Sequence, residues 1–272
     1  MTDTLLQPSV KKQLQSVVEL SPQSILLHGR SGVGLCTTAK ELALRMTSKS
    51  SIITIEPDEK GSIKIKTIRE LYGQTRTKHS EKLIIILDDA DTMLTPAQNA
   101  LLKLLEEPPE HIVFILTAHT PQILLPTIMS RVQKLEILPI SSKQTDKLLD
   151  SLGIKNDKKR LQIHFMAEGL PAEIIRLTES NEYFATRTDS IKTARAFIQG
   201  STYKKLATSY QIGNDRDKAM SLLRDVAHIV EVSIKQKPSA SLAGLLSNIV
   251  LAQEKLLADG NIRSQLLRLA LS

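Results

Sequence analysis

Four short segments in the first half of the chain are apolar at nearly every position, and segments with helical apolar spacing lie between them. The predicted strands are 24–28, 51–56, 82–87 and 112–117, and the predicted helices are 37–46, 65–74 and 97–106. A strand that is apolar on both sides is buried on both faces, as in a parallel sheet covered by helices. The pattern therefore predicts an α/β domain with a parallel sheet over residues 1–140.

The pattern changes after Ile137, where no strand-like run recurs and apolar residues fall at helical spacing. Three short helices are predicted around 148–152, 163–167 and 174–178, within a unit spanning 141–182. A loop over 180–189 is predicted to separate them from a last helical bundle, assigned to 183–272, in which Lys237-Pro238 marks a break.

Composition narrows the class of protein. The chain has 272 residues, of which 41% are apolar and 24% charged, with 11 Gly and 11 Pro, so it is globular and large enough for two or three units. The longest uncharged run, 111–130, contains Pro121 and Pro126, which excludes a membrane span. The acidic Asp3 at the start argues against a secretory signal and predicts a cytoplasmic protein. The single cysteine, Cys36, excludes an internal disulfide and a multi-cysteine zinc site.

The positive charge is concentrated in the second half. Residues 1–140 carry 16 Lys+Arg against 15 Asp+Glu, and residues 141–272 carry 20 against 14, so +6 of the net +7 lies there. Lys192, Arg195, Lys204 and Lys205 are candidates for contact with DNA. Aromatic residues are only 3%, so the chain lacks the interleaved stacking platforms of a dedicated single-strand binder. A basic excess of this size is also typical of plain solubility.

A glycine-rich segment follows the first predicted strand. In a P-loop, glycines let backbone N–H groups surround phosphates, a Lys reaches the terminal phosphates and a Ser or Thr holds magnesium. Gly29, Gly32 and Gly34 have this spacing, but Leu35 stands where the Lys belongs and Cys36 where the Ser or Thr belongs. The segment is either a decayed nucleotide loop or an ordinary tight turn, and the three glycines favour the former.

Two acids, Asp88 and Asp89, end the third predicted strand. P-loop enzymes place a magnesium-bound carboxylate and a water-activating carboxylate at such a strand end. Asp88 fits the first role, whereas Asp89 is one methylene shorter than the usual Glu. Capping of a following helix is the alternative role for this pair.

The segments that follow have a recognisable order: Asn-Ala-Leu-Leu-Lys-Leu-Leu-Glu-Glu-Pro-Pro at 99–109, Phe-Ile-Leu-Thr at 114–117 and Ser-Arg-Val at 130–132. With 65–71, 169–176 and 261–269, they resemble the AAA+ clamp-loader subunits of bacterial replication, most closely those of the delta-prime type. The resemblance covers essentially the whole chain and is most specific over 82–131. It implies an AAA+ P-loop domain with a parallel sheet, a small three-helix lid and a C-terminal helical collar for oligomerisation.

The resemblance also implies roles for single residues. Arg131 matches an arginine finger that acts in the ATP site of a neighbouring subunit. The alternative is an ordinary surface arginine. Val132 replaces the cysteine that is usual beside the finger. Thr117 matches the first sensor, the alternative being a strand-end threonine. Ala172 stands where the second sensor would be an arginine, so that residue is absent.

The implied function is that of a non-catalytic subunit, because Leu35, Cys36 and Ala172 each replace a catalytic residue. Such a subunit requires no cofactor of its own, because ATP is bound by the neighbouring subunits. Whether this chain itself retains nucleotide is left open. Implied partners are gamma/tau-like motor subunits, a delta-like clamp-opening subunit, the sliding clamp and primed DNA. The four-cysteine zinc module of many relatives is absent, and no metal ligand is assigned. An active AAA+ ATPase and a stand-alone DNA-binding module remain alternatives.

Overall fold

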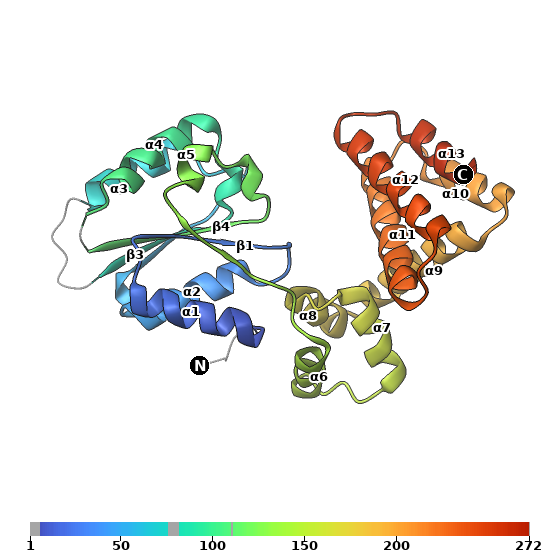
Figure 1. Ribbon diagram of the computed structural model, residues 1–272, viewed down its shortest axis with the longest axis horizontal. Helices are drawn as coiled ribbons and strands as arrows, with labels where there is room; N and C mark the ends of the chain where they lie inside the picture. Colours follow the sequence, from blue (N-terminus) through green and yellow to red (C-terminus); the bar gives the residue numbers. More distant parts are fainter. Residues whose placement is uncertain (1–5, 76–81, 110, 272) are drawn as a thin grey trace. The chain divides into compact units, whose positions relative to one another are not determined.

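The computed structural model describes residues 6–75, 82–109 and 111–271. The first five residues, on which the argument against a secretory signal partly depends, lie outside this part. The chain divides into two compact units, Met1–Thr178 and Glu179–Ser272 (Figure 1). The sheet and the three-helix segment both belong to the first unit, and the boundaries predicted after residues 140 and 182 stay predictions.

The first unit is built on a five-stranded parallel sheet, as predicted. Its strands are β1 (Ser24–His28), β2 (Ile52–Ile55), β3 (Leu83–Leu87), β4 (Ile112–Ala118) and β5 (Gln133–Glu136), in the order β2-β3-β4-β1-β5. The four predicted strands are confirmed to within one or two residues. The edge strand β5 is absent from the prediction because only Leu135 in it is buried.

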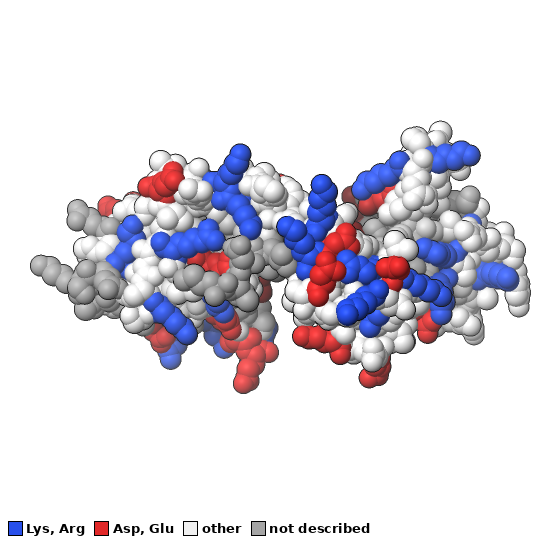
Figure 2. Space-filling model, turned by 90° about the horizontal axis from the view of Figure 1, so that it is seen from below, with Lys and Arg blue, Asp and Glu red and all other residues white. Residues whose placement is uncertain are grey.

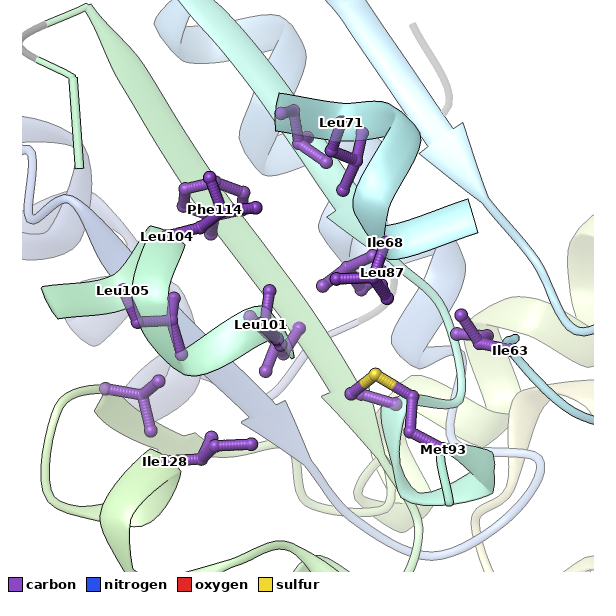
Figure 3. Close-up of a cluster of buried hydrophobic side chains, with 14 of the residues drawn as sticks. Ile63, Ile68, Leu71, Leu87, Met93, Leu101, Leu104, Leu105, Phe114 and Ile128 are labelled. Carbon is purple, nitrogen blue, oxygen red and sulfur yellow. The ribbon is translucent and has the colours of Figure 1, made fainter. Parts of the chain in front are cut away.

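Helices cover both faces of this sheet (Figure 1). Figure 3 shows the core on one face, where α3 (Ile65–Thr75), α4 (Thr95–Glu106) and α5 (Pro126–Met129) pack on the strands. The opposite face is covered by α1 (Pro8–Leu20) and α2 (Leu35–Met46). Along β3, Ile85 belongs to the first core and Ile84 and Ile86 to the second, which explains why this strand is apolar throughout. Short 3₁₀ turns occur at Lys49–Ser51, Ala90–Thr92 and Pro121–Ile123.

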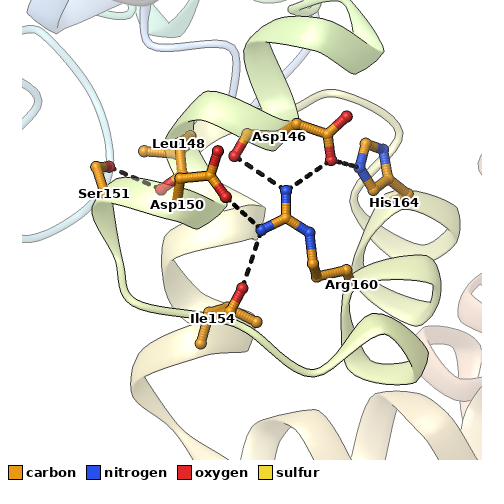
Figure 4. A network of polar contacts seen from close by, with 7 residues as sticks. All are labelled: Asp146, Leu148, Asp150, Ser151, Ile154, Arg160 and His164. Atoms are coloured by element: carbon orange, nitrogen blue, oxygen red, sulfur yellow. Dashed lines mark hydrogen bonds and ion pairs between the residues drawn. The ribbon is translucent and has the colours of Figure 1, made fainter.

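The three predicted short helices are confirmed as α6 (Ser142–Ser151), α7 (Asp157–Ala167) and α8 (Pro171–Glu179). Arg160 of α7 joins the first two, as Figure 4 shows, by ion pairs of 2.6 Å to Asp150 and 2.9 Å to Asp146. His164 Nε2 lies 2.9 Å from the Asp146 carboxylate. The hydrogen bond with His164, and then that with Arg160, lowers the pKa of Asp146.

The second unit consists of helices: α9 (Asn181–Gln199), α10 (Thr202–Ile212), α11 (Arg216–Gln236), α12 (Ala240–Leu257) and α13 (Ile262–Leu271). The predicted break at Lys237-Pro238 is confirmed between α11 and α12. Arg187 of α9 donates two hydrogen bonds of 2.9 Å to Asp225 of α11, whose side chain is only 7% exposed. Removing either partner would leave a buried charge, so the pair fixes α9 against α11. None of the helices in the described part of the chain combines the length and apolar character needed to cross a bilayer.

The predicted loop over 180–189 is wrong, because α9 is already helical from Asn181. Ser180 caps the helix, its side chain accepting a hydrogen bond from the Tyr183 N–H at 3.1 Å. The polar residues that suggested a loop are accommodated within the helix. Thr186 and Thr188, for example, donate their hydroxyl hydrogens to the carbonyls four residues earlier at 3.0 and 2.8 Å.

Candidate functional site

The predicted site residues meet at one edge of the sheet. β1 pairs with β4 and β4 pairs with β3, all parallel, so their carboxyl ends lie side by side. The glycine-rich loop follows β1, Asp88 and Asp89 follow β3, and Thr117 lies near the end of β4. Ligands of open α/β sheets bind at this edge, so the sheet brings together the residues that the sequence singled out, apart from Arg131.

The backbone of the glycine-rich loop has a conformation that requires glycine. Gly32 and Gly34 have φ angles of +85° and +92°, which residues with a Cβ rarely adopt. A Cβ on Gly29 would lie 2.5 Å from the carbonyl oxygen of Ile137. Helix α2 begins at Leu35, two residues before the predicted start. The loop thus keeps the strand–turn–helix frame of a P-loop.

The two residues that replace the P-loop Lys and Ser/Thr are part of this frame. Leu35 is 3% exposed and belongs to the core that α2 shares with the sheet. The Cys36 thiol is half-buried, and its pKa is raised to about 11, first by burial and then by the hydrogen bond and the negative charge of Asp88. A buried alkyl group and a neutral thiol provide neither a phosphate-binding cation nor a hydroxyl for magnesium.

The two strand ends are joined through Thr117. Its hydroxyl donates a hydrogen bond of 2.7 Å to Asp88 Oδ1 and accepts one of 2.8 Å from the Asp89 N–H. The side chain of Thr117 is buried, and Asp89 has a φ of +48°. Burial, and then the charge of Asp88, raises the pKa of the Asp89 carboxyl. Thr117 therefore fixes the positions of both acids.

His119 is a site residue that is absent from the sequence-based prediction. Its Nε2 lies 3.3 Å from Asp89 Oδ1 and its Nδ1 lies 3.0 Å from the Gly29 carbonyl oxygen. Its backbone N–H donates to Asp91 Oδ2 at 3.0 Å. The imidazole thus connects the glycine-rich loop with the second acid. The rule that selected Asp88, a polar residue directly after a buried strand, also selects His119, which follows β4.

One set of side chains at this edge has the spacing of metal ligands. The ligand atoms of Cys36, Glu56 and Asp88 all lie within 4.8 Å of one another. The ammonium group of Lys40 lies 3.4 Å from Glu56 Oε1 and also interacts with the Cys36 thiol. The charge of Lys40 already offsets part of the negative charge of this cluster, and the thiol would have to lose its proton to bind a metal.

The turn between α7 and α8, together with the start of α8, contacts the glycine-rich loop directly. The Ala172 N–H donates a hydrogen bond of 3.1 Å to the Gly32 carbonyl, and Arg30 forms an ion pair of 2.9 Å with Glu168. Leu170, between them, packs against the core that contains Leu35. Ala172 therefore approaches the loop through its backbone, at the position where the second sensor arginine would be expected.

Arg131 lies apart from these residues, after α5. Its side chain is 37% exposed and forms an ion pair of 3.0 Å with Glu106, the last residue of α4. It also donates hydrogen bonds to the Thr127 carbonyl and the Ser130 hydroxyl, at 3.0 and 3.4 Å. Val132 beside it is buried in the core between the sheet and α3, α4 and α5. In the described part of the chain, the recorded polar contacts of Arg131 are with α4 and α5 rather than with the strand ends.

Comparisons with known proteins agree with this arrangement. The family model for "DNA polymerase III, delta subunit" matches residues 44–141. The DNA polymerase III subunit delta' of Bacillus subtilis is 29% identical over 212 residues, covering 69% of this chain and 64% of that protein. The gamma/tau subunit of Mycobacterium tuberculosis H37Rv is 35% identical over 103 residues, covering 36% of this chain and 17% of that protein. The chain thus spans less than two thirds of the length of either relative.

A solved structure shows the same fold. The crystal structure of a DNA polymerase III gamma subunit-related protein from Thermotoga maritima matches with a TM-score of 0.55 and 19% identity, over 95% of this chain and 97% of that chain. The parallel sheet and the helices that cover and follow it therefore form the same fold as that protein. In sequence, the chain is similar to the DNA polymerase III delta-subunit family over residues 44–141, and its relatives include subunits delta' of that polymerase.

Proposed function

We propose that the chain is a non-catalytic clamp-loader subunit of the delta-prime type. In this proposal it assembles with gamma/tau-like motor subunits and a delta-like clamp-opening subunit, and helps to load the sliding clamp onto primed DNA. Similarity to both delta' and gamma/tau subunits supports the clamp-loader role. The observation that carries the non-catalytic assignment is the burial of Leu35 at the position where a P-loop needs a lysine.

The chemistry of the site supports the absence of ATP hydrolysis. Phosphoryl transfer depends almost entirely on positioning and on stabilising negative charge. At this edge of the sheet the P-loop cation and hydroxyl are replaced by Leu35 and Cys36, and the second sensor by Ala172. The chain therefore needs no cofactor, and ATP is bound by its neighbours.

The contribution of the chain to catalysis is Arg131, supplied to a neighbouring subunit as an arginine finger. The side chain is accessible, and its ion pair with Glu106 and its bond to the Thr127 carbonyl orient the guanidinium before a partner binds. A planar guanidinium donates two parallel hydrogen bonds to phosphate oxygens, which an ammonium group cannot do. In the assembled ring, the γ-phosphate of a neighbour's ATP replaces Glu106 as the partner of Arg131.

An active ATPase is the second candidate, and the Asp88–Thr117 pair favours it. A buried threonine that holds a strand-end carboxylate in place is also what a magnesium-binding acid would require. In the non-catalytic proposal, the same pair serves to join β3 to β4.

The test uses both the isolated chain and the reconstituted complex. Steady-state phosphate release by the chain alone, with magnesium and primed DNA, should equal background. In the complex, Arg131→Ala should preserve assembly. It should lower ATP hydrolysis by about 10³–10⁵-fold at the one neighbouring ATP site that Arg131 completes, and Arg131→Lys should restore little of that rate. Arg45→Ala, which removes an exposed arginine of α2, is the matched control and should retain normal rates.

Two results would contradict the proposal. Turnover by the chain alone that disappears in Asp88→Asn would establish the ATPase instead. Normal clamp loading by an assembled Arg131→Ala complex, with assembly verified by size-exclusion chromatography, would remove the finger role.

A further inference from the structure

The carboxylate of Glu106 lies at a helix end where negative charge is unfavourable. Glu106 is the last residue of α4, and Glu107 follows it at the C-cap. The C-terminal end of a helix carries partial negative charge on its unpaired carbonyl groups, so two acidic side chains there are poorly placed. Lys103 is the basic residue of the last turn. The guanidinium of Arg131, 3.0 Å from Glu106 Oε1, brings a second positive charge from outside the helix.

This ion pair is more enclosed than an ordinary surface pair. On the face drawn in Figure 2, acidic and basic side chains lie among one another over much of the surface. Lys192 and Asp189 of α9 form a pair of the ordinary kind at 2.8 Å, in which each side chain is 72% exposed. The side chains of Arg131 and Glu106 are 37% and 47% exposed. Because water screens it less, we expect this pair to reach the upper part of the range for exposed pairs, about fivefold in an equilibrium constant.

Arg131 also has contacts that do not depend on Glu106. It donates hydrogen bonds to the Thr127 carbonyl at 3.0 Å and to the Ser130 hydroxyl at 3.4 Å. Both acceptors belong to the short helix α5 and its C-cap, directly before Arg131 in the chain. They are uncharged, and they remain in place when the charge of Glu106 is removed. The guanidinium therefore keeps a local anchor without Glu106, and the main contribution of Glu106 is its negative charge.

We infer that Glu106 competes with the phosphates of a neighbour's nucleotide for Arg131, and thereby weakens and makes reversible the contact of the finger. The inference rests on the function proposed above, in which Arg131 leaves Glu106 for the γ-phosphate. When Arg131 leaves, Glu106 loses its partner at the negative end of α4 and lies near a phosphate of the same sign. Binding of the terminal phosphate must offset both effects. After hydrolysis, Glu106 pairs with Arg131 again. Glu106 is thus a positioning residue that acts through Arg131.

The first measurement tests the ion pair in the isolated full chain. Urea unfolding of Glu106→Gln, Arg131→Ala and the double variant gives the coupling between the two side chains. We expect a coupling of about three- to fivefold in the unfolding equilibrium constant, which decreases as salt is added. The matched control replaces Glu106→Gln by Glu107→Gln, because Glu107 is the adjacent exposed acid and has no ion pair recorded among the described residues. Its coupling with Arg131→Ala should be about 1.5-fold or less.

The second measurement is the affinity of the full chain for a gamma/tau-like motor subunit loaded with a non-hydrolysable ATP analogue or with ADP, followed by fluorescence anisotropy. Glu106→Gln should tighten the complex with the ATP analogue by about three- to fivefold, because the competing charge is removed. It should tighten the ADP complex less, since no terminal phosphate is there to bind the finger. In the Arg131→Ala background, Glu106→Gln should have no effect. Glu107→Gln should stay within about 1.5-fold of the original chain.

Three results would overturn the inference while leaving the finger in place. Weaker binding of the ATP-analogue complex by Glu106→Gln would show that the carboxylate orients Arg131 and does not compete for it. Unchanged binding would show that the carboxylate has neither effect. A coupling between Glu106 and Arg131 no larger than that of Glu107 would show that the pair does not form in solution. Normal affinity of Arg131→Ala for the ATP-loaded motor subunit would instead overturn the function proposed above, and this inference with it.

Discussion

The glycine-rich loop and helix α10 use their side chains in opposite ways. In the loop, the backbone has the conformation that phosphate binding requires, yet Leu35 is part of the core and the Cys36 thiol is paired with Asp88. On helix α10 (Thr202–Ile212), the backbone is ordinary helix, and Tyr203 and Tyr210 are each 80% exposed. The difference teaches that a familiar backbone motif is a weak indicator of binding when its side chains already serve the fold.

The largest expected effect tests whether Leu35 belongs to the core. Leu35→Lys should lower the free energy of unfolding by about 2–5 kcal/mol, because a buried apolar side chain is lost and a charge must reach solvent. Leu35→Met, of similar volume, should cost less than about 1.5 kcal/mol. Urea unfolding followed by circular dichroism measures both. If Leu35→Lys is as stable as the original chain and binds nucleotide tightly, position 35 is not required for the core. The loop would then differ from a working P-loop chiefly in lacking the lysine.

The next effect concerns the Cys36 thiol. Its pKa of about 11, against an ordinary 9.0, reduces the thiolate fraction at pH 8 by about a hundredfold and should slow alkylation accordingly. The neutral thiol is the form stabilised by folding, so reactivity should continue to rise up to about pH 11. Iodoacetamide labelling is unambiguous because Cys36 is the only cysteine.

Asp88→Asn sharpens this measurement, because it removes the charge and alters the hydrogen bond that raise the pKa of Cys36. Labelling of that variant should be faster at pH 8, and labelling of the urea-unfolded chain faster still. A rate that levels off near pH 9 in the folded chain would mean that the thiol is solvated and is not held by Asp88.

The smallest effect is expected on helix α10. Replacing Tyr203 and Tyr210 by alanine should change the free energy of unfolding by no more than about 0.5 kcal/mol for each residue, because neither side chain is packed. The same urea titration provides the measurement. A loss of more than 2 kcal/mol per residue would show that these rings serve the fold, as Leu35 does.

The parts of the fold that the sequence predicts are those with a strong periodic signal. β3 is apolar throughout, β4 is apolar except at Thr117, and both strands carry the core on both faces, so their position and the parallel sheet follow from the pattern of apolar residues. β5 gives no such signal, because it is an edge strand with one buried residue. Helix α1 is absent from the prediction, although Val10, Leu14 and Val17 have helical spacing and are buried.

The sequence predicts which residues belong to the candidate site, but it does not predict the hydrogen bonds between them. Strand ends locate Asp88 and Thr117, yet the hydrogen bond between them depends on the β3–β4 register. The sequence shows that the P-loop lysine is absent, but it does not show that the Leu35 side chain points into the core. His119 was accessible to the strand-end rule, and only its contacts with Asp89 and Gly29 reveal its position in the site.

The strand order has a consequence for how the chain folds during synthesis. β1 is made early, but its neighbours in the sheet are β4 and β5, which follow some ninety and one hundred residues later. The glycine-rich loop consequently leaves the ribosome long before its supporting strands exist, and the backbone of 168–172 that contacts it is made later still. Contacts so distant along the sequence form slowly, so the sheet cannot close around β1 until the end of β5 is available. Until then, the apolar residues of β1 are exposed to chaperones and to aggregation, and translation speed between 30 and 136 becomes a determinant of folding yield.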